Sequence, residues 1–314
     1  DGRLFVASGA QLLGFAKSGT TYAPIAALKY DLLQAFGAEV SGGLSTQGTK
    51  LVLAAGHQVH LFDVAPQTPS DAPEVSSPNR LSGCDVSHLN QPRSAFLTPL
   101  GQLVVADTFN NRVLVWSTVP QTGHLSDPDL VLGQRSADKC APNDDDGDGN
   151  TDAASARTMS HPSSVWSDGV RLAVADYRNH RVLLWNTFPN ATDPASHRPS
   201  VVLGQADLGS VGANAGKGRP SANTLAFPSS VDGSQAGELA VADSGNNRVL
   251  IWRTYPIGTA LPADRRTDHE VELAFVIGRT ANRVPASDAL RYVAGYAIGL
   301  DITIRGSVDR SFRK

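Results

Sequence analysis

Cysteine, methionine and aromatic residues are scarce in this chain of 314 residues, and its charges of opposite sign nearly balance. No apolar run approaches the ~20 residues that a membrane-spanning helix requires, so we predict no transmembrane segment. A formal net charge of −3 together with 6% aromatic residues gives no basis for nucleic acid as a partner. The hydrophobic content of 41% and the charged content of 18% are typical of a folded globular protein.

The two cysteines, Cys84 and Cys140, are too few for a disulfide scaffold. They can form one bridge in an oxidising compartment, and two unrelated thiols are the alternative. The sequence opens on Asp1 and Gly2 without a charged and then apolar leader, which fits a processed mature chain. We therefore expect an exported protein that is secreted, periplasmic or attached to the cell surface.

The chain also lacks the compact motifs of common catalytic sites. None of the eight histidines forms a His-x-x-x-His pair, and no Cys-x-x-Cys pair with zinc spacing is present. There is no Gly-x-Ser-x-Gly turn and no phosphate-binding glycine-rich loop. These absences favour a protein that is not an enzyme, although a site assembled from distant segments would leave no such trace.

The chain does contain one sequence pattern that is repeated three times. The pattern Leu-x-Val-Ala-Asp-x-x-Asn-x-Arg-Val-Leu-x-Trp occurs at 103–116, 172–185 and 239–252. Self-similarity of this kind indicates a repeat architecture before any single residue indicates chemistry. Each copy predicts a β-hairpin that is apolar on both faces, with asparagines in a turn that requires left-handed backbone angles.

Weaker copies lie near 3–15, 50–62 and 290–304. The first two replace both the Asp of the pattern (by Ser8 and Ala55) and its Arg (by Gln11 and Gln58). Because the two residues are lost together, we expect them to be structural partners across the turn rather than catalytic groups. The predicted pairs are Asp107 with Arg112, Asp176 with Arg181, and Asp243 with Arg248.

Six repeats, each with four short apolar segments, predict an all-β fold: a six-bladed β-propeller with four-stranded antiparallel blades. We expect one domain over residues 1–314. Because the chain starts inside its first blade, the segment 301–304 is expected to supply a missing strand there and to close the ring.

The pattern Val-Ala-Asp-x-x-Asn-x-Arg-Val-Leu-x-Trp closely resembles NHL repeats, which form six-bladed propellers. Its trailing Val-Leu-Gly-Gln resembles that of secreted or cell-surface bacterial NHL-repeat proteins. The resemblance covers roughly 91–279 and is diffuse elsewhere. It implies a fold more than a function, because members include protein-binding modules, RNA-binding platforms and sensor domains, and close relatives include metal-dependent lyases and lactonases.

An insertion at 135–160 contains carboxylates at alternate positions around a tight glycine turn. Such spacing lets one short loop supply several oxygen ligands to calcium. The predicted ligands are Asp144, Asp146, Asp148 and Asp152, together with the main-chain carbonyl of Asn150. The bidentate Glu of an EF-hand is absent, since Ser155 stands at its position, and a self-repelling acidic loop is the alternative.

We predict a structural role for this calcium, which would order the insertion while a Cys84–Cys140 bridge fastens it to the preceding blade. The function expected from these features is a non-catalytic, exported scaffold that presents loops to a protein or glycan partner, or to a larger surface assembly. The alternative is a metal-dependent lyase, lactonase or other hydrolase with its active site in the central channel.

Overall fold

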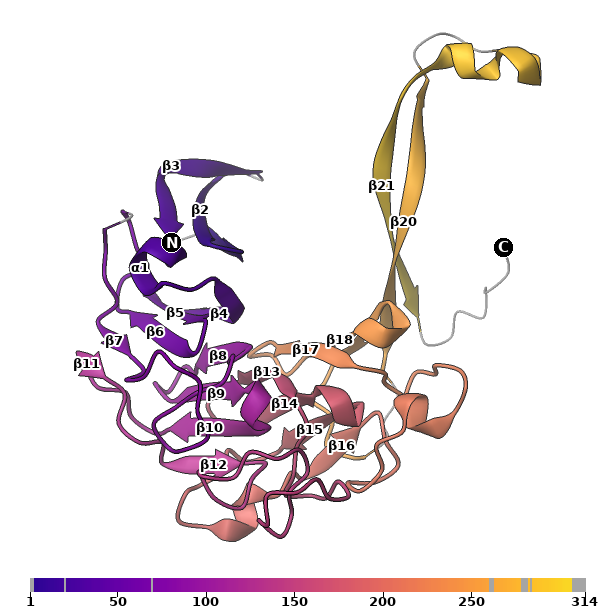
Figure 1. Cartoon of the computed structure of the whole chain (residues 1–314). Helices are drawn as coiled ribbons and strands as arrows, with labels where there is room; N and C mark the ends of the chain where they lie inside the picture. The colour runs from indigo at the N-terminus through magenta and orange to yellow at the C-terminus, as the bar shows by residue number, and fades with distance from the viewer. Residues whose placement is uncertain are drawn as a thin grey trace.

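Five β-sheets follow one another along the chain and are arranged like the blades of a propeller (Figure 1). The structure is a computed structural model that describes residues 3–19, 21–68, 70–259, 263–277, 282 and 284–306. The first sheet contains, in order, β1 (Arg3–Ser8), β2 (Gln11–Ser18) and β3 (Thr21–Asp31). The second has the order β11-β7-β6-β5-β4, built from β4 (Val40–Gln47), β5 (Lys50–Ala55), β6 (Gln58–Phe62), β7 (Val75–Ser76) and β11 (Gly123–His124).

The three strong copies of the sequence pattern form the central hairpins of the remaining sheets. The third sheet contains β8 (Ser94–Leu97), β9 (Leu103–Asp107), β10 (Arg112–Trp116) and β12 (Leu130–Leu132). The fourth contains β13 (Pro162–Ser167), β14 (Leu172–Asp176), β15 (Arg181–Trp185) and β16 (Val201–Leu203). The fifth contains β17 (Pro228–Gly233), β18 (Leu239–Asp243), β19 (Arg248–Trp252), β20 (Arg265–Ile277) and β21 (Val293–Gly306).

Helices are few and short. The α-helix α1 (Leu32–Phe36) follows the first sheet, with Asp31 as its N-cap and Gly37 as its left-handed C-cap. The remaining helical segments are 3₁₀ turns: η1 (Thr108–Asn110), η2 (Tyr177–Asn179), η3 (Pro194–His197), η4 (Ala213–Gly216), η5 (Ser244–Asn246) and η6 (Ala286–Tyr292). At the end of η1, η2 and η5 stands a residue with positive φ, which is Asn111, His180 or Asn247.

The core lies between successive sheets, because the hairpin strands are apolar on both faces. In β14, Leu172 and Val174 belong to the cluster shared with the third sheet. Their neighbours Ala173 and Ala175 belong to the cluster shared with the fifth sheet. The alternation of a strand thus sends successive residues to opposite sides, and burial of both sides holds the sheets together in sequence. Strands β4, β8, β13 and β17 line a central cavity of about 380 Å³.

The prediction of six four-stranded blades is wrong in number. The structure has five sheets, of which two are four-stranded, and the pair β7–β11 is parallel. The segment expected to form a sixth hairpin near 290–304 lies instead largely in β21, which pairs with β20 from Val293 to Gly306. Because β20 offers an antiparallel partner along nearly the whole of β21, the segment 301–304 does not close a ring at the first blade. The hairpin extends away from the sheets (Figure 1).

Candidate functional site

The long hairpin of β20 and β21 places acidic residues from distant sequence positions in register. Glu270 is paired with Asp301 across the two strands, and Glu272 is paired with Gly299. Directly paired residues of an antiparallel ladder share a face, as do residues i and i+2 of one strand. Positions 270, 272 and 301 therefore belong to one face of the hairpin.

Two acidic residues opposite each other destabilise a ladder unless something offsets their repulsion. Carboxylate oxygens are the ligands that hard divalent cations such as Mg²⁺ and Mn²⁺ prefer. The donor set Glu270, Glu272 and Asp301 therefore fits a divalent metal ion by its chemistry. Sequence reasoning missed these three residues. The available signal was a Glu-x-Glu pair inside one apolar run and an Asp inside another.

The acidic insertion brings together three of the predicted calcium ligands. One carboxylate oxygen from each of Asp144, Asp146 and Asp152 lies within 4.8 Å of the others. Asp144 is fully buried, and its two oxygens accept hydrogen bonds from the backbone N–H groups of Gly147 and Gly149 at 2.7 and 3.0 Å. Among the side chains that the structure describes, this is the one group of three or more such residues close enough to share a metal.

Asp148 and Asn150 are arranged differently from the other predicted ligands. The Asp148 carboxylate accepts hydrogen bonds from the backbone N–H and the side-chain amide of Asn150, at 2.7 and 2.9 Å. These bonds hold the pKa of Asp148 below its usual value. Asp148 is thus engaged with its own loop and does not belong to the group of three carboxylates.

A disulfide joins Cys84 to Cys140, with their Cα atoms 6.0 Å apart. It links the loop that enters the third sheet to the start of the acidic insertion. The side-chain amide of Asn111 donates to the Cys140 carbonyl at 2.8 Å, so the turn after η1 also fixes the position of Cys140. The insertion is therefore anchored at its beginning by a covalent and a hydrogen-bonded contact.

The acid and base of the three strong repeats form buried ion pairs. In each pair the Arg Nε donates to the Asp Oδ2 at 2.7 Å: Arg112 to Asp107, Arg181 to Asp176, and Arg248 to Asp243. The Asp176 carboxylate also accepts from the Ser160 N–H at 2.7 Å and from the Asn179 amide at 2.8 Å. Side chains with this burial and this number of partners are structural and are not available to a substrate.

The histidines do not form a metal-binding cluster with other described side chains. His60 is stacked on Phe36 with ring centroids 3.6 Å apart, and its Nδ1 lies 2.8 Å from the Ser76 hydroxyl. Burial lowers its pKa to about 3, so this imidazole is neutral at physiological pH. It is a core residue of the first two sheets.

Comparison with known proteins points to the part of the chain that contains the hairpin. A sequence model of the fumarylacetoacetate (FAA) hydrolase C-terminal family matches residues 226–312. A maleylpyruvate hydrolase of Aquipseudomonas alcaligenes is 67% identical over 51 residues, which are 16% of this chain and 18% of that protein. A mitochondrial oxaloacetate tautomerase of Arabidopsis thaliana is 60% identical over 37 residues, 12% of this chain and 17% of that protein.

The chain thus spans about a fifth of the length of these curated relatives. Among solved structures, Hsv2 of Kluyveromyces lactis matches with a TM-score of 0.42 and 11% identity, over 98% of this chain and 71% of that one. A likeness this distant contributes nothing to the functional argument.

These findings overturn several expectations from the sequence. The resemblance to NHL-repeat proteins is contradicted, because the family whose model matches is that of FAA hydrolase. The three strong repeats lie in the blades, whereas the match to the FAA hydrolase family includes the segment 290–304 that was predicted to be a sixth copy. The expectation of a non-catalytic scaffold is wrong for the same reason, since the relatives are named as a hydrolase and as tautomerases.

The predicted partner and location are corrected as well. The relatives' names refer to small molecules, which contradicts a protein, a glycan or a surface assembly as the partner. Export to the cell surface is also contradicted, since relatives in Arabidopsis thaliana and Rattus norvegicus are described as mitochondrial. Within the described part of the chain, the helices are all too short or too polar to cross a bilayer.

Proposed function

We propose that this chain is a metal-dependent hydrolase or tautomerase that acts on a small oxo acid. One observation carries the proposal: the segment 226–312, matched by the FAA hydrolase family, contains the hairpin in which Glu270 is paired with Asp301. The named substrates of the relatives, maleylpyruvate and oxaloacetate, are both short oxo acids that carry carboxylate groups. The substrate class proposed here is that shared chemistry.

Glu270, Glu272 and Asp301 are the residues that would hold the metal. A divalent cation bound there supplies a Lewis acid that polarises an oxo or carboxylate oxygen of the substrate. The chain contributes the donors on two adjacent strands, so that residues 29 or more positions apart in sequence act on one ion. Hydrogen bonding along the ladder fixes their register and therefore their mutual spacing.

The test uses the purified full chain with oxaloacetate and with maleylpyruvate, followed by absorbance in the presence of Mg²⁺ or Mn²⁺. We expect turnover of at least one acid, its loss on adding a chelator, and its loss in Glu270→Gln. Glu39→Gln is the matched control, because Glu39 is an exposed acid outside the hairpin. Turnover of neither acid with either cation, or full activity of Glu270→Gln, contradicts the proposal.

A second, structural role is proposed for the acidic insertion. The grouping of Asp144, Asp146 and Asp152 supports binding of a cation, and oxygen donors from a short loop favour Ca²⁺ over transition metals. Asp148 and the carbonyl of Asn150 remain proposed ligands, and Asp148 would have to exchange its present hydrogen bonds with Asn150. This ion would stabilise the insertion and take no part in the reaction.

A further inference from the structure

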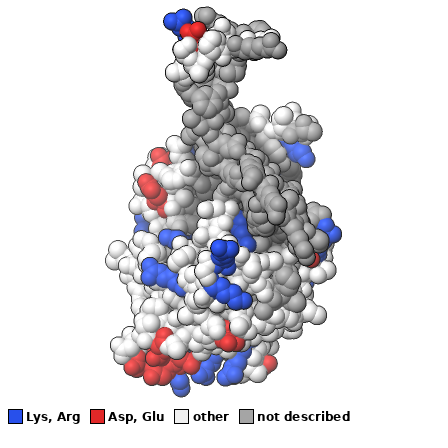
Figure 2. All heavy atoms as spheres, turned by 90° about the vertical axis from the view of Figure 1, so that its right-hand side faces the viewer, with Lys and Arg blue, Asp and Glu red and all other residues white. Residues whose placement is uncertain are grey.

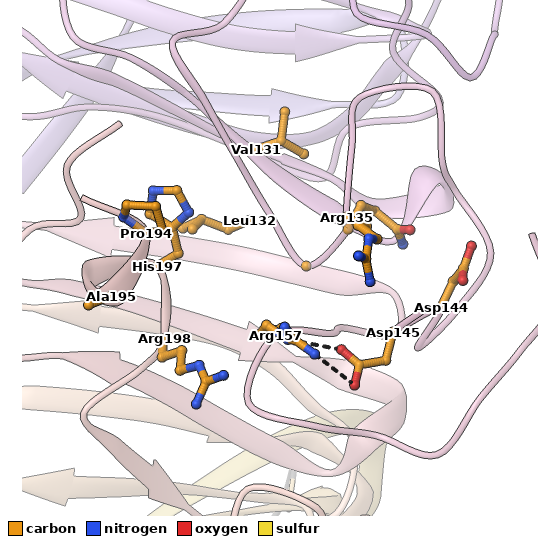
Figure 3. Close-up of a pocket in the computed structure, with 12 residues that line it drawn as sticks. Val131, Leu132, Arg135, Asp144, Asp145, Arg157, Pro194, Ala195, His197 and Arg198 are labelled. Carbon is orange, nitrogen blue, oxygen red and sulfur yellow. Dashed lines mark hydrogen bonds and ion pairs between the residues drawn. The ribbon is translucent and has the colours of Figure 1, made fainter. Parts of the chain in front are cut away.

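A cavity of about 610 Å³ lies beside the acidic insertion, on the third and fourth sheets (Figure 3). Its walls come from three segments: the end of β12 with the residues after it, the insertion itself, and η3. Its size is that of a small-molecule site. None of its lining residues belongs to β20 or β21, so it is separate from the proposed catalytic hairpin.

Three arginines line this cavity: Arg135 and Arg157, at the start and near the end of the insertion, and Arg198, directly after η3. In Figure 3 the guanidinium of Arg157 faces Asp145, with its Nε 3.1 Å from Oδ1 and its second nitrogen 3.3 Å from Oδ2. Arg135 and Arg198 form no hydrogen bond or ion pair with any side chain or backbone group in the described ranges. Two cationic groups therefore remain available to a ligand.

The acidic residues of the cavity are already engaged. Both oxygens of Asp144 accept backbone N–H groups of its own loop, and Asp145 is paired with Arg157. The uncommitted charge in the cavity is consequently positive. At the lower end of the molecule in Figure 2, acidic and basic side chains likewise lie close together on the surface.

The backbone around the two free arginines is well supported. Gly147 has φ of +80°, and a Cβ added there would lie 3.0 Å from Cδ of Arg135, so the acidic loop packs against the aliphatic part of that side chain. On the other wall, Asp193 caps η3 by accepting from the Ala195 N–H at 3.0 Å. His197 is held by contact of its Nε2 with the Asn190 carbonyl at 3.0 Å. Residue 198 thus follows a short segment that is fixed at both ends.

We propose that this cavity binds a small molecule bearing carboxylate or phosphate oxygens, through Arg135 and Arg198. Guanidinium groups recognise both kinds of oxyanion with paired, charge-assisted hydrogen bonds. The site requires neither turnover nor metal binding at the hairpin, so it stands whether or not the proposed activity does.

The test is calorimetric titration of the full chain at constant ionic strength with succinate and with inorganic phosphate, and with neutral succinamide as the ligand control. We expect saturable binding of at least one anion and none of succinamide. Preference for succinate indicates a ligand that bears carboxylate groups, and preference for phosphate indicates one that bears a phosphate group. Saturable binding of neither anion overturns the proposal.

The matched variants are the double substitution Arg135→Gln with Arg198→Gln, and Arg219→Gln as the control. All three arginines are exposed, so the variants should melt as the wild type does. Each lost charge-assisted contact is expected to weaken binding about ten-fold, giving roughly 100-fold for the pair. Arg219→Gln should bind as the wild type. Unchanged affinity in the double variant would also overturn the proposal.

Discussion

The repeated sheets and the long hairpin use acidic residues in opposite ways. In the third, fourth and fifth sheets each buried Asp is matched with an Arg at 2.7 Å. In the hairpin, Glu270 is matched with another acid, Asp301. An acid matched with a base is neutralised within the fold, whereas the register of two acids is the basis of the metal site proposed above. We therefore expect substitutions in the sheets to change stability, and substitutions in the hairpin to change activity.

The largest effect is expected from breaking a buried pair in the fourth sheet. Arg181→Ala leaves the Asp176 carboxylate buried without its counterion, which costs about 3–5 kcal/mol of unfolding free energy. Urea denaturation followed by circular dichroism measures the loss. Arg178→Ala, which removes an exposed neighbouring arginine, should change it by less than ~0.5 kcal/mol. Equal stability of the two variants would mean that the buried pair does not stabilise the fold.

Removing the disulfide should have the next largest effect on stability. Cys84 and Cys140 are 56 residues apart, and a bridge over that separation restricts the unfolded chain by an amount worth about 2–4 kcal/mol. Cys84→Ser with Cys140→Ser should lower the urea midpoint accordingly. Reduction of the wild type should reproduce the change, and reduction of the double variant should add nothing. A wild-type midpoint that is insensitive to reductant would contradict the bridge.

Substitution of the paired acid in the hairpin should lower activity without lowering stability, in contrast to the two changes above. Asp301→Asn is expected to lower turnover by roughly 100-fold, since loss even of groups that support a metal ligand costs 10–100-fold. The melting temperature without added metal should stay constant or rise, because a like-charge pair is removed. Asp288→Asn, in the exposed turn of η6, is the control. If Asp301→Asn lost stability but kept its turnover, the proposed difference between the sheets and the hairpin would be contradicted.

The smallest effect concerns calcium at the acidic insertion. At a free Ca²⁺ concentration about ten times Kd, binding should add ~1.4 kcal/mol to the unfolding free energy. Thermal melts with Ca²⁺ and with a chelator should differ for the wild type and coincide for Asp146→Asn with Asp152→Asn. Asp127→Asn, another exposed acid, should retain the difference. Identical wild-type melts under both conditions would contradict the proposed site.

Much of the blade structure could be predicted from sequence, because its determinants are local. The apolar alternation and asparagine turns of 103–116, 172–185 and 239–252 predict hairpins, and each of the three forms one. The number of sheets could not be read in the same way. Whether 290–304 forms a blade hairpin of its own or pairs with 265–277 depends on strand register, which a faint apolar pattern does not determine.

The hairpin carboxylates were missed because their grouping is also a matter of register. Glu270 and Asp301 become neighbours only once β20 and β21 are paired. In the acidic insertion, in contrast, the carboxylates lie within a few residues of one another in the sequence, so their grouping could be predicted. Even there, sequence could not show that Asp148 bonds to Asn150 rather than joining Asp144, Asp146 and Asp152.

The repeat arginines do more than neutralise their aspartates, because each guanidinium also binds loop carbonyls. Arg181 donates to the carbonyls of Ser155 and Thr158, in the loop entering its own sheet, and to that of Leu208, in the loop entering the next. Arg112 likewise donates to the carbonyl of Ala137, so the third sheet is coupled to the fourth and the fourth to the fifth. Unfolding should consequently spread between adjacent sheets in chain order, as in a linear array with nearest-neighbour cooperativity. Hydrogen exchange of the fifth sheet should therefore report an arginine lost in the fourth.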